Sequence, residues 1–224
     1  MKERRPMSSP FLYVALGDSI TEGYSVPRKY GYAPMFTSLL QGTGHQVTLR
    51  NFGIKGMTSS HLLTQLYVPM VQQSLQQANL TTVCIGGNDL LYAYVQYVFY
   101  RNTLIYSRVV NQFTVNLNRI YSIVRQHTLA PIYAINLYNP FPNSRSASHW
   151  IPVLNQAIAR TSERWEIPVV DIYHRFKGLE HRLIYGYRRG VLSDLRLLGI
   201  KPIHPNFLGH RVITEALWEV IRRS

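Results

Sequence analysis

Five short apolar segments alternate along the chain with five longer segments of helical periodicity, and this alternation constrains the fold most. The strand-like segments, rich in branched residues, are 12–16, 46–51, 81–85, 131–136 and 168–172. Between them, apolar side chains recur every three or four positions over about residues 31–41, 59–77, 105–126, 147–164 and 207–222. Strands that alternate with helices predict a three-layer α/β/α fold, in which right-handed crossovers build a parallel sheet covered on both faces.

The length of the chain is consistent with one domain. With 224 residues, 46% of them hydrophobic, it can bury one substantial core, and no linker-like stretch, repeat or low-complexity tract divides it. We therefore expect a single domain over residues 1–224. Residues 1–10 precede the first strand and are expected to form an N-terminal extension that can be flexible.

A serine follows the first strand at the position where open α/β sheets keep their chemistry. Residues 16–23 read Leu-Gly-Asp-Ser-Ile-Thr-Glu-Gly, directly after an apolar run. Gly17 lets the backbone turn sharply, so Ser19 is expected at the carboxyl edge of the sheet. Taken alone, a serine at a turn is more often a helix cap than a catalytic residue.

Three further polar motifs follow in a fixed order, over residues 51–58, 85–89 and 203–210. Each has a simpler interpretation in isolation. Gly53 and Gly56 suit a turn, Asn88 suits a cap, and His204 suits a packed surface position. Four such motifs in this order outweigh those separate interpretations.

Together the four motifs resemble the Gly-Asp-Ser-Leu family of serine esterases and lipases, also called SGNH hydrolases, over about residues 11–219. The resemblance implies a flavodoxin-like five-stranded sheet of order 2-1-3-4-5. It also implies that Ser19 is the nucleophile, that His204 is the general base, and that Gly56 and Asn88 join the Ser19 amide in the oxyanion hole.

The chemistry of acyl transfer agrees with these roles. A serine hydroxyl is a weak nucleophile at neutral pH and needs an adjacent base, for which histidine is suited. The negative oxygen of the tetrahedral intermediate needs fixed hydrogen-bond donors. Gly56 can bring its amide close because it has no side chain, and Asn88 offers a neutral NH2 group.

One position departs from the family pattern. Family members usually carry an aspartate three residues before the histidine, where this chain has Lys201. Asp194, ten positions before His204, is a weak candidate for the acid, and a backbone carbonyl could orient the ring instead. We therefore expect a Ser19–His204 dyad, or an incomplete triad, and a slow enzyme.

The other three aspartates have more plausible local roles. Asp18 and Asp89 belong to motifs and are expected to brace the turns there, and Asp171 ends a strand-like segment.

Tyrosines are concentrated after the Asn88 motif, at positions 92, 94, 97, 100 and 106. Their rings could wall an acyl or aromatic pocket, with Tyr92 and Tyr97 as candidate substrate-binding residues. Alternatively, Tyr97 simply continues a helix face into the core.

The formal net charge of +13 raises the question of an anionic partner. Between residues 181 and 201, five basic residues accompany Asp194 as the single acid: Arg182, Arg188, Arg189, Arg196 and Lys201. If this segment lies over the site, it favours an anionic substrate or membrane surface; otherwise it is a solvated surface. No nucleic acid is expected, because the chain lacks a recognisable binding signature.

These features predict a serine hydrolase of carboxylic esters, of the esterase, lipase or lysophospholipase type, acting on a small-molecule or lipid ester. The alternatives are a carbohydrate O-deacetylase of the same fold and a catalytically impaired binding protein. No metal or other cofactor is expected, because Cys84 is the sole cysteine and His204 and His210 lack metal-ligand spacing. No apolar run approaches the ~20 residues of a membrane span, so a cytoplasmic enzyme is expected, or a secreted one if a leader was removed.

Overall fold

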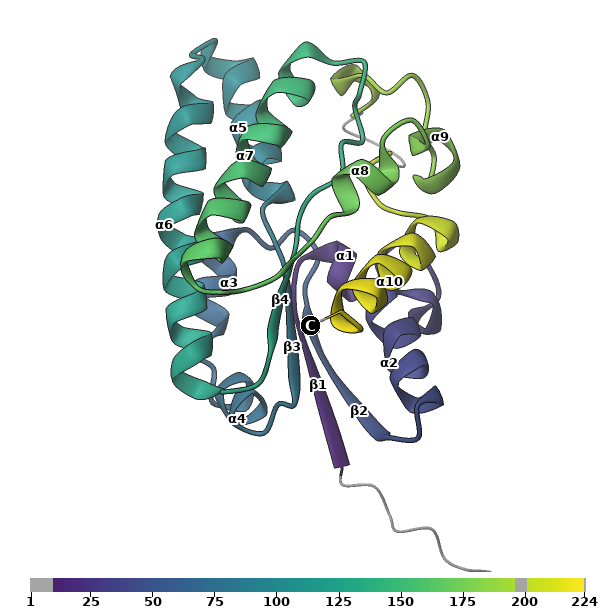
Figure 1. Cartoon of the computed structure of the whole chain (residues 1–224). Helices are drawn as coiled ribbons and strands as arrows, with labels where there is room; N and C mark the ends of the chain where they lie inside the picture. The colour runs from purple at the N-terminus through teal and green to yellow at the C-terminus, as the bar shows by residue number, and fades with distance from the viewer. Residues whose placement is uncertain (1–9, 196–200, 224) are drawn as a thin grey trace, which may run out of the picture.

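A computed structural model of the chain describes residues 10–195 and 201–223. Its centre is a five-stranded sheet of order β2-β1-β3-β4-β5, in which every neighbouring pair is parallel (Figure 1). The strands are β1 Pro10–Gly17, β2 Gln46–Gly53, β3 Leu80–Cys84, β4 Ile132–Ile135 and β5 Val169–Val170. The expected flavodoxin-like order is confirmed.

Helices cover both faces of the sheet, as Figure 1 shows. One layer consists of α3 Ser59–Gln65, α4 Pro69–Gln76, α5 Gly87–Tyr100, α6 Leu104–His127 and α7 Arg145–Arg164. The other consists of α2 Tyr32–Gly42, α8 Ile172–Phe176, α9 Glu180–Leu183 and α10 Phe207–Ile221. Short helices α1 Ser19–Glu22, η1 Arg28–Tyr30 and η2 Leu192–Asp194 lie in the connections.

Strand β1 shows why two layers are needed. From Tyr13 onward its residues are buried, and they alternate between two hydrophobic clusters: Val14 and Leu16 pack with the α6 layer, whereas Tyr13 and Ala15 pack with the α10 layer. Successive side chains of a strand point to opposite faces, so a strand with two buried faces reads as a continuous apolar run. The three-layer α/β/α architecture follows from this pattern.

Two helical segments differ from the sequence expectation. Residues 59–77 form two helices, because Pro69 occupies the first turn of α4, where its missing N–H is not needed. Residues 87–100 form α5, which the apolar periodicity does not reveal because nearly all of its positions are apolar.

The carboxyl ends of the three central strands meet at one edge. Gly17 pairs with Gly53 of β2 on one side and with Cys84 of β3 on the other. A Cβ atom on Gly17 would lie 2.2 Å from the Cys84 carbonyl oxygen, so only glycine allows this approach. The motifs that follow β1, β2 and β3 are thereby brought to the same place.

Within the described ranges, no helix has both the length and the apolar character needed to cross a membrane.

Candidate active site

Ser19 is presented by a capped turn at the end of β1. It is the first residue of α1, and the Asp18 carboxylate caps this helix by accepting a 2.9 Å hydrogen bond from the Ile20 amide. Both Asp18 and Ser19 are buried. Burial raises the pKa of Asp18 to about 7, because a carboxylate loses its hydration there.

His204 reaches Ser19 from the far end of the chain. Its Nε2 lies 3.0 Å from the Ser19 Oγ, across 185 positions of sequence. This is the distance required for a base to take the hydroxyl proton. The structure thus brings the expected nucleophile and base together.

The segment that carries His204 is anchored through its backbone. The carbonyl oxygens of residues 203–205 each accept a hydrogen bond, and the three donors come from different parts of the chain. The Tyr138 hydroxyl donates to residue 203, the Tyr185 amide donates to His204 over 2.9 Å, and the Ser25 hydroxyl donates to residue 205. No sequence motif links these anchors to the histidine.

The imidazole ring is flanked by an aromatic side chain and by positive charge. The ring centroids of Tyr24 and His204 lie 4.9 Å apart. The ammonium group of Lys55 lies over the Tyr24 ring, with Nζ 3.8 Å from its centroid. Burial, followed by the positive charges of Lys55 and Lys201, lowers the pKa of His204 to about 4. The imidazole is therefore neutral at neutral pH and able to accept a proton, but its protonated form is poorly stabilised.

The structure does not bring Asp194 to the histidine. The Asp194 carboxylate accepts hydrogen bonds from the amides of Arg189 and Val191, over 3.0 and 3.2 Å, and from Arg189 Nε over 3.2 Å. It therefore orders the turn that contains it. Within residues 10–195 and 201–223, no carboxylate or carbonyl accepts a hydrogen bond from Nδ1 of His204.

Asn88 connects the motifs that follow the three central strands. It lies in the first turn of α5, and its Nδ2 is 2.9 Å from the Met57 carbonyl oxygen and 3.5 Å from Asp18 Oδ2. Gly56, beside Met57, has a φ of +80°, and a Cβ atom there would meet nothing within 4 Å. Its backbone conformation, rather than a close approach, is thus the reason for glycine at this position.

A buried polar network fixes the Asn88 helix against α3. The Asp89 carboxylate accepts hydrogen bonds from the Ser59 amide over 2.9 Å and from the Ser59 hydroxyl over 2.6 Å. Asn116 of α6 then donates to the hydroxyls of Ser59 and Ser60, both over 2.9 Å. Asp89 therefore holds α5 to the first turn of α3 rather than bracing only its own turn, and Asn116 is a member that no sequence motif indicates.

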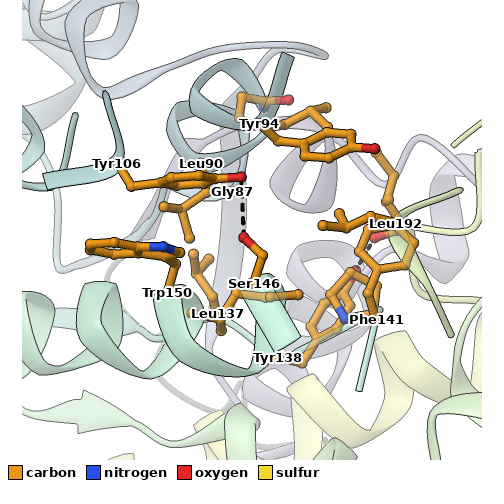
Figure 2. A pocket seen from close by; sticks show the side chains of 16 residues that line it. Gly87, Leu90, Tyr94, Tyr106, Leu137, Tyr138, Phe141, Ser146, Trp150 and Leu192 are labelled. Atoms are coloured by element: carbon orange, nitrogen blue, oxygen red, sulfur yellow. Dashed lines mark hydrogen bonds between the residues drawn. The ribbon is translucent and has the colours of Figure 1, made fainter. Parts of the chain in front are cut away.

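An apolar pocket of about 100 Å³ adjoins the site between α5, α6 and α7 (Figure 2). Two residues beside the reacting groups line it. Asn88 hydrogen-bonds to Asp18, which precedes Ser19, and Ile203 precedes His204. Aromatic side chains form much of its wall: Trp150 stacks on Tyr106 with centroids 5.1 Å apart, and Ser146 donates a 3.2 Å hydrogen bond to the Tyr106 hydroxyl.

The tyrosines of this pocket are not the two that the sequence suggested. Tyr94 and Tyr106 line it. Tyr92 is exposed instead, and Tyr97 packs against Tyr106 with ring centroids 5.8 Å apart without lining the cavity. Tyr92 and Tyr97, the two candidates from the sequence, therefore do not line this cavity, whereas Tyr94, Tyr106 and Tyr138 do.

The basic segment 181–201 is only partly described. Arg182 and Arg188 are exposed, and Arg189 forms an ion pair with Asp194. The positive charge of Lys201 contributes to the lowered pKa of His204. Arg196 lies outside the described residues. Over the described part of the chain, no group of three or more His, Cys, Asp or Glu side chains is arranged to hold a metal ion.

Known proteins are similar to this chain in sequence and in fold. The chain is 26% identical to the spore germination lipase LipC of Bacillus licheniformis over 212 residues, which is 92% of this chain and 93% of the relative. It is 21% identical to the uncharacterized protein YpmR of Bacillus subtilis, with coverage of 94% and 81%.

Solved structures include the lipase Lip_vut3 from a goat rumen metagenome, at a TM-score of 0.80 and 25% identity, covering 94% of this chain and 97% of that one. Axe2, an acetylxylan esterase from Geobacillus stearothermophilus, shares the fold at a TM-score of 0.72 and 16% identity, with coverage of 97% and 96%. The sequence model of the GDSL-like lipase/acylhydrolase family matches residues 15–212, and the chain belongs to that family.

Proposed function

We propose that the protein hydrolyses carboxylic esters through an acyl-enzyme, with Ser19 as the nucleophile and His204 as the base. The observation that carries the proposal is the 3.0 Å contact between His204 Nε2 and Ser19 Oγ. It is supported by the low pKa of the buried His204, which leaves Nε2 free to accept the hydroxyl proton.

The reaction has two balanced halves. His204 Nε2 takes the proton of Ser19 while Oγ bonds to the acyl carbon, and the carbonyl oxygen becomes negative. The Ser19 amide, the Gly56 amide and Asn88 Nδ2 are the proposed donors to that oxygen. Collapse of the intermediate breaks the ester bond, and His204 returns the proton to the leaving alcohol. Water, deprotonated by His204, then attacks the acyl carbon. The bond between that carbon and Ser19 Oγ breaks, His204 returns the proton to Oγ, and the acid is released.

The pocket favours an apolar acyl or aryl group over a sugar. Its wall is built largely from aromatic and aliphatic side chains, including Tyr94, Tyr106 and Trp150, with few polar groups. A sugar would leave several hydroxyls without partners in such a place, at a cost for each one. We therefore propose an esterase or lipase rather than a carbohydrate O-deacetylase, in agreement with the lipase names of two relatives.

A panel of substrates tests this assignment. Rates on p-nitrophenyl acetate, butyrate, octanoate and palmitate are compared with acetate release from acetylated xylan, in the wild type and in Ser19→Ala. We expect hydrolysis of the longer acyl esters and none by Ser19→Ala. Ser38→Ala serves as the matched control and should retain turnover, because the exposed Ser38 hydroxyl donates to a carbonyl within α2, away from the pocket.

Covalent trapping separates the alternatives. A fluorophosphonate probe should label the wild type at Ser19, identified by peptide mass spectrometry. Faster release of acetate from xylan than of octanoate would assign the deacetylase function instead. A folded protein that neither labels nor turns over any ester would overturn the proposal in favour of a binding protein without catalysis.

A further inference from the structure

Helix α5 is apolar nearly all round and yet is partly exposed. Between residues 90 and 100 its one polar side chain is Gln96. Helices of this composition are normally buried. One side of α5 is buried, through Leu90 and Ala93. The other side leaves large apolar side chains in contact with solvent, which marks an interaction surface.

The exposure increases toward the carboxyl end of the helix. Tyr92, Val95 and Val98 are moderately to well exposed, and the last two residues of α5 are more so: Phe99 is 77% and Tyr100 is 74% exposed. Leu104, at the start of α6, is also exposed. We call residues 98–104, which join α5 to α6, the α5 apex.

The charge around the apex has a single sign. Residues 90–162, which include α6 and all but the first three residues of α5 and the last two of α7, contain no Asp or Glu. The same range contains six arginines: Arg101, Arg108, Arg119, Arg125, Arg145 and Arg160. Arg101 lies within the apex and Arg108 lies one turn beyond it on α6, and both are exposed. An apolar tip beside exposed arginines complements an anionic lipid surface, in which negatively charged headgroups cover an apolar acyl-chain layer.

We propose that the α5 apex docks on an anionic lipid surface, with Phe99, Tyr100 and Leu104 entering the interface and Arg101 and Arg108 facing the headgroups. A second copy of the chain is a poorer occupant, because pairing two acid-free surfaces brings arginines together without a counter-charge. This inference extends the proposed function by naming where its lipid substrate is met.

The same helix connects the docking surface to the pocket. Leu90 and Tyr94 of α5 line the pocket, as Figure 2 shows. Five residues separate Tyr94 from Phe99, a rise of about 8 Å along a helix. A protein docked by its apex therefore holds the pocket close to the lipid, so that an acyl chain has a short path to Ser19.

Vesicle binding tests the proposal without any reading of activity. Ser19→Ala protein is mixed with sucrose-loaded vesicles of phosphatidylcholine, alone or with about one third phosphatidylglycerol, and bound protein is sedimented. We expect binding to the anionic vesicles about tenfold or more stronger than to the neutral ones, and a decrease in high salt. Because the protein is catalytically silent, failure of the proposed hydrolysis would leave this result unchanged.

Paired variants locate the surface. Phe99→Ser with Tyr100→Ser should weaken binding at least about tenfold. Leu129→Ser is the matched control, because Leu129 is 97% exposed in the connection at the opposite end of α6 (Figure 1). It should leave binding unchanged.

A second pair of substitutions tests the role of the two arginines. Arg101→Asn with Arg108→Gln should reduce binding to anionic vesicles alone, and asparagine suits the left-handed φ of +52° at position 101. Arg164→Gln, at the far end of α7, is its control.

Two results would overturn the proposal. The first is sedimentation with anionic vesicles that is absent, or that the apex variants do not change. The second is an apex-dependent dimer in analytical ultracentrifugation at the concentrations used, which would assign the surface to a second copy of the chain.

Discussion

The proposed nucleophile and the proposed base of this site are held by different means. Ser19 follows its strand directly, its helix is capped by the adjacent Asp18, and the neighbouring Asn88 helix is fixed by the Asp89 network. These groups lie within two residues of a strand end or helix start. Their placement is therefore a local consequence of the sheet edge.

His204 has no such local support. Its position depends on donors to three successive carbonyls, from Ser25, Tyr138 and Tyr185, and on the ring of Tyr24. These interactions fix the location of the imidazole but carry no negative charge to stabilise its protonated form. In the serine triad, one aspartate both orients the imidazole and stabilises its protonated form. In this site the imidazole is held in place without that stabilisation, so the two requirements are separate.

The largest effect is expected from the base itself. His204→Gln removes the proton acceptor at similar size, so kcat/KM should fall by about 10³-fold or more. Steady-state hydrolysis of the best ester measures this, with circular dichroism to check the fold. A loss below about tenfold would mean that another group activates Ser19.

The oxyanion side should come next. Asn88→Ala removes a proposed donor, and the expected loss in kcat is about 10²- to 10³-fold with KM little changed. Asn118→Ala is the control, since Asn118 Nδ2 donates to a carbonyl within α6, away from the site. A rise in KM at unchanged kcat would instead assign Asn88 to substrate binding.

The buried carboxylate beside Ser19 should affect stability. Burial raises the folded-state pKa of Asp18 to about 7, above its unfolded value, so the folded protein loses stability as pH rises from about 4 through 7. Asp18→Asn keeps a good helix cap and removes this dependence.

At pH 8 the free energy of unfolding should rise by about 2 kcal/mol in the Asp18→Asn variant, roughly half of what the full pKa shift represents, because solvent relaxes around a buried charge. Urea unfolding at pH 4, 6 and 8 measures this. If the free energies of unfolding of wild type and variant differ by the same amount at all three pH values, Asp18 does not have a raised pKa in the folded protein.

The anchors of the histidine segment should have the smallest effect. Ser25→Ala and Tyr138→Phe each remove one hydrogen bond to the backbone around His204, so kcat/KM should fall about three- to tenfold. Tyr121→Phe is the matched control, because the buried Tyr121 hydroxyl bonds to Ser162 elsewhere in the core. If Tyr121→Phe lowers both the free energy of unfolding and kcat/KM as much as the two anchor variants do, the anchors do not position the base.

The local half of the site is the half that sequence predicts best. Ser19 and Asn88 follow apolar runs that become β1 and β3, so the strand ends fix them. Tyr138 and Ser25 lie 65 and 180 positions from the carbonyls they bind, and no local pattern links such residues.

The sequence indicates an aromatic pocket but not which of its tyrosines line it, for a related reason. A shift of two positions on a helix turns a side chain by about 200°, so choosing Tyr92 instead of Tyr94 required the phase of α5. That phase is set by where the helix begins, at Gly87, and by its packing on α6.

The most direct test of a dyad without a carboxylate is the pH dependence of Ser19 labelling by a fluorophosphonate. The rate constant is measured in the wild type and in Asp18→Asn, which removes the buried carboxyl group beside Ser19 whose pKa is raised to about 7. We expect labelling to require His204, to stay constant down to about pH 5 and to fall with a midpoint near 4, and we expect Lys55→Met to move the midpoint upward. A midpoint at or above the ordinary histidine value of about 6.5, in both proteins, would contradict this expectation by showing that the imidazolium has a stabilising partner.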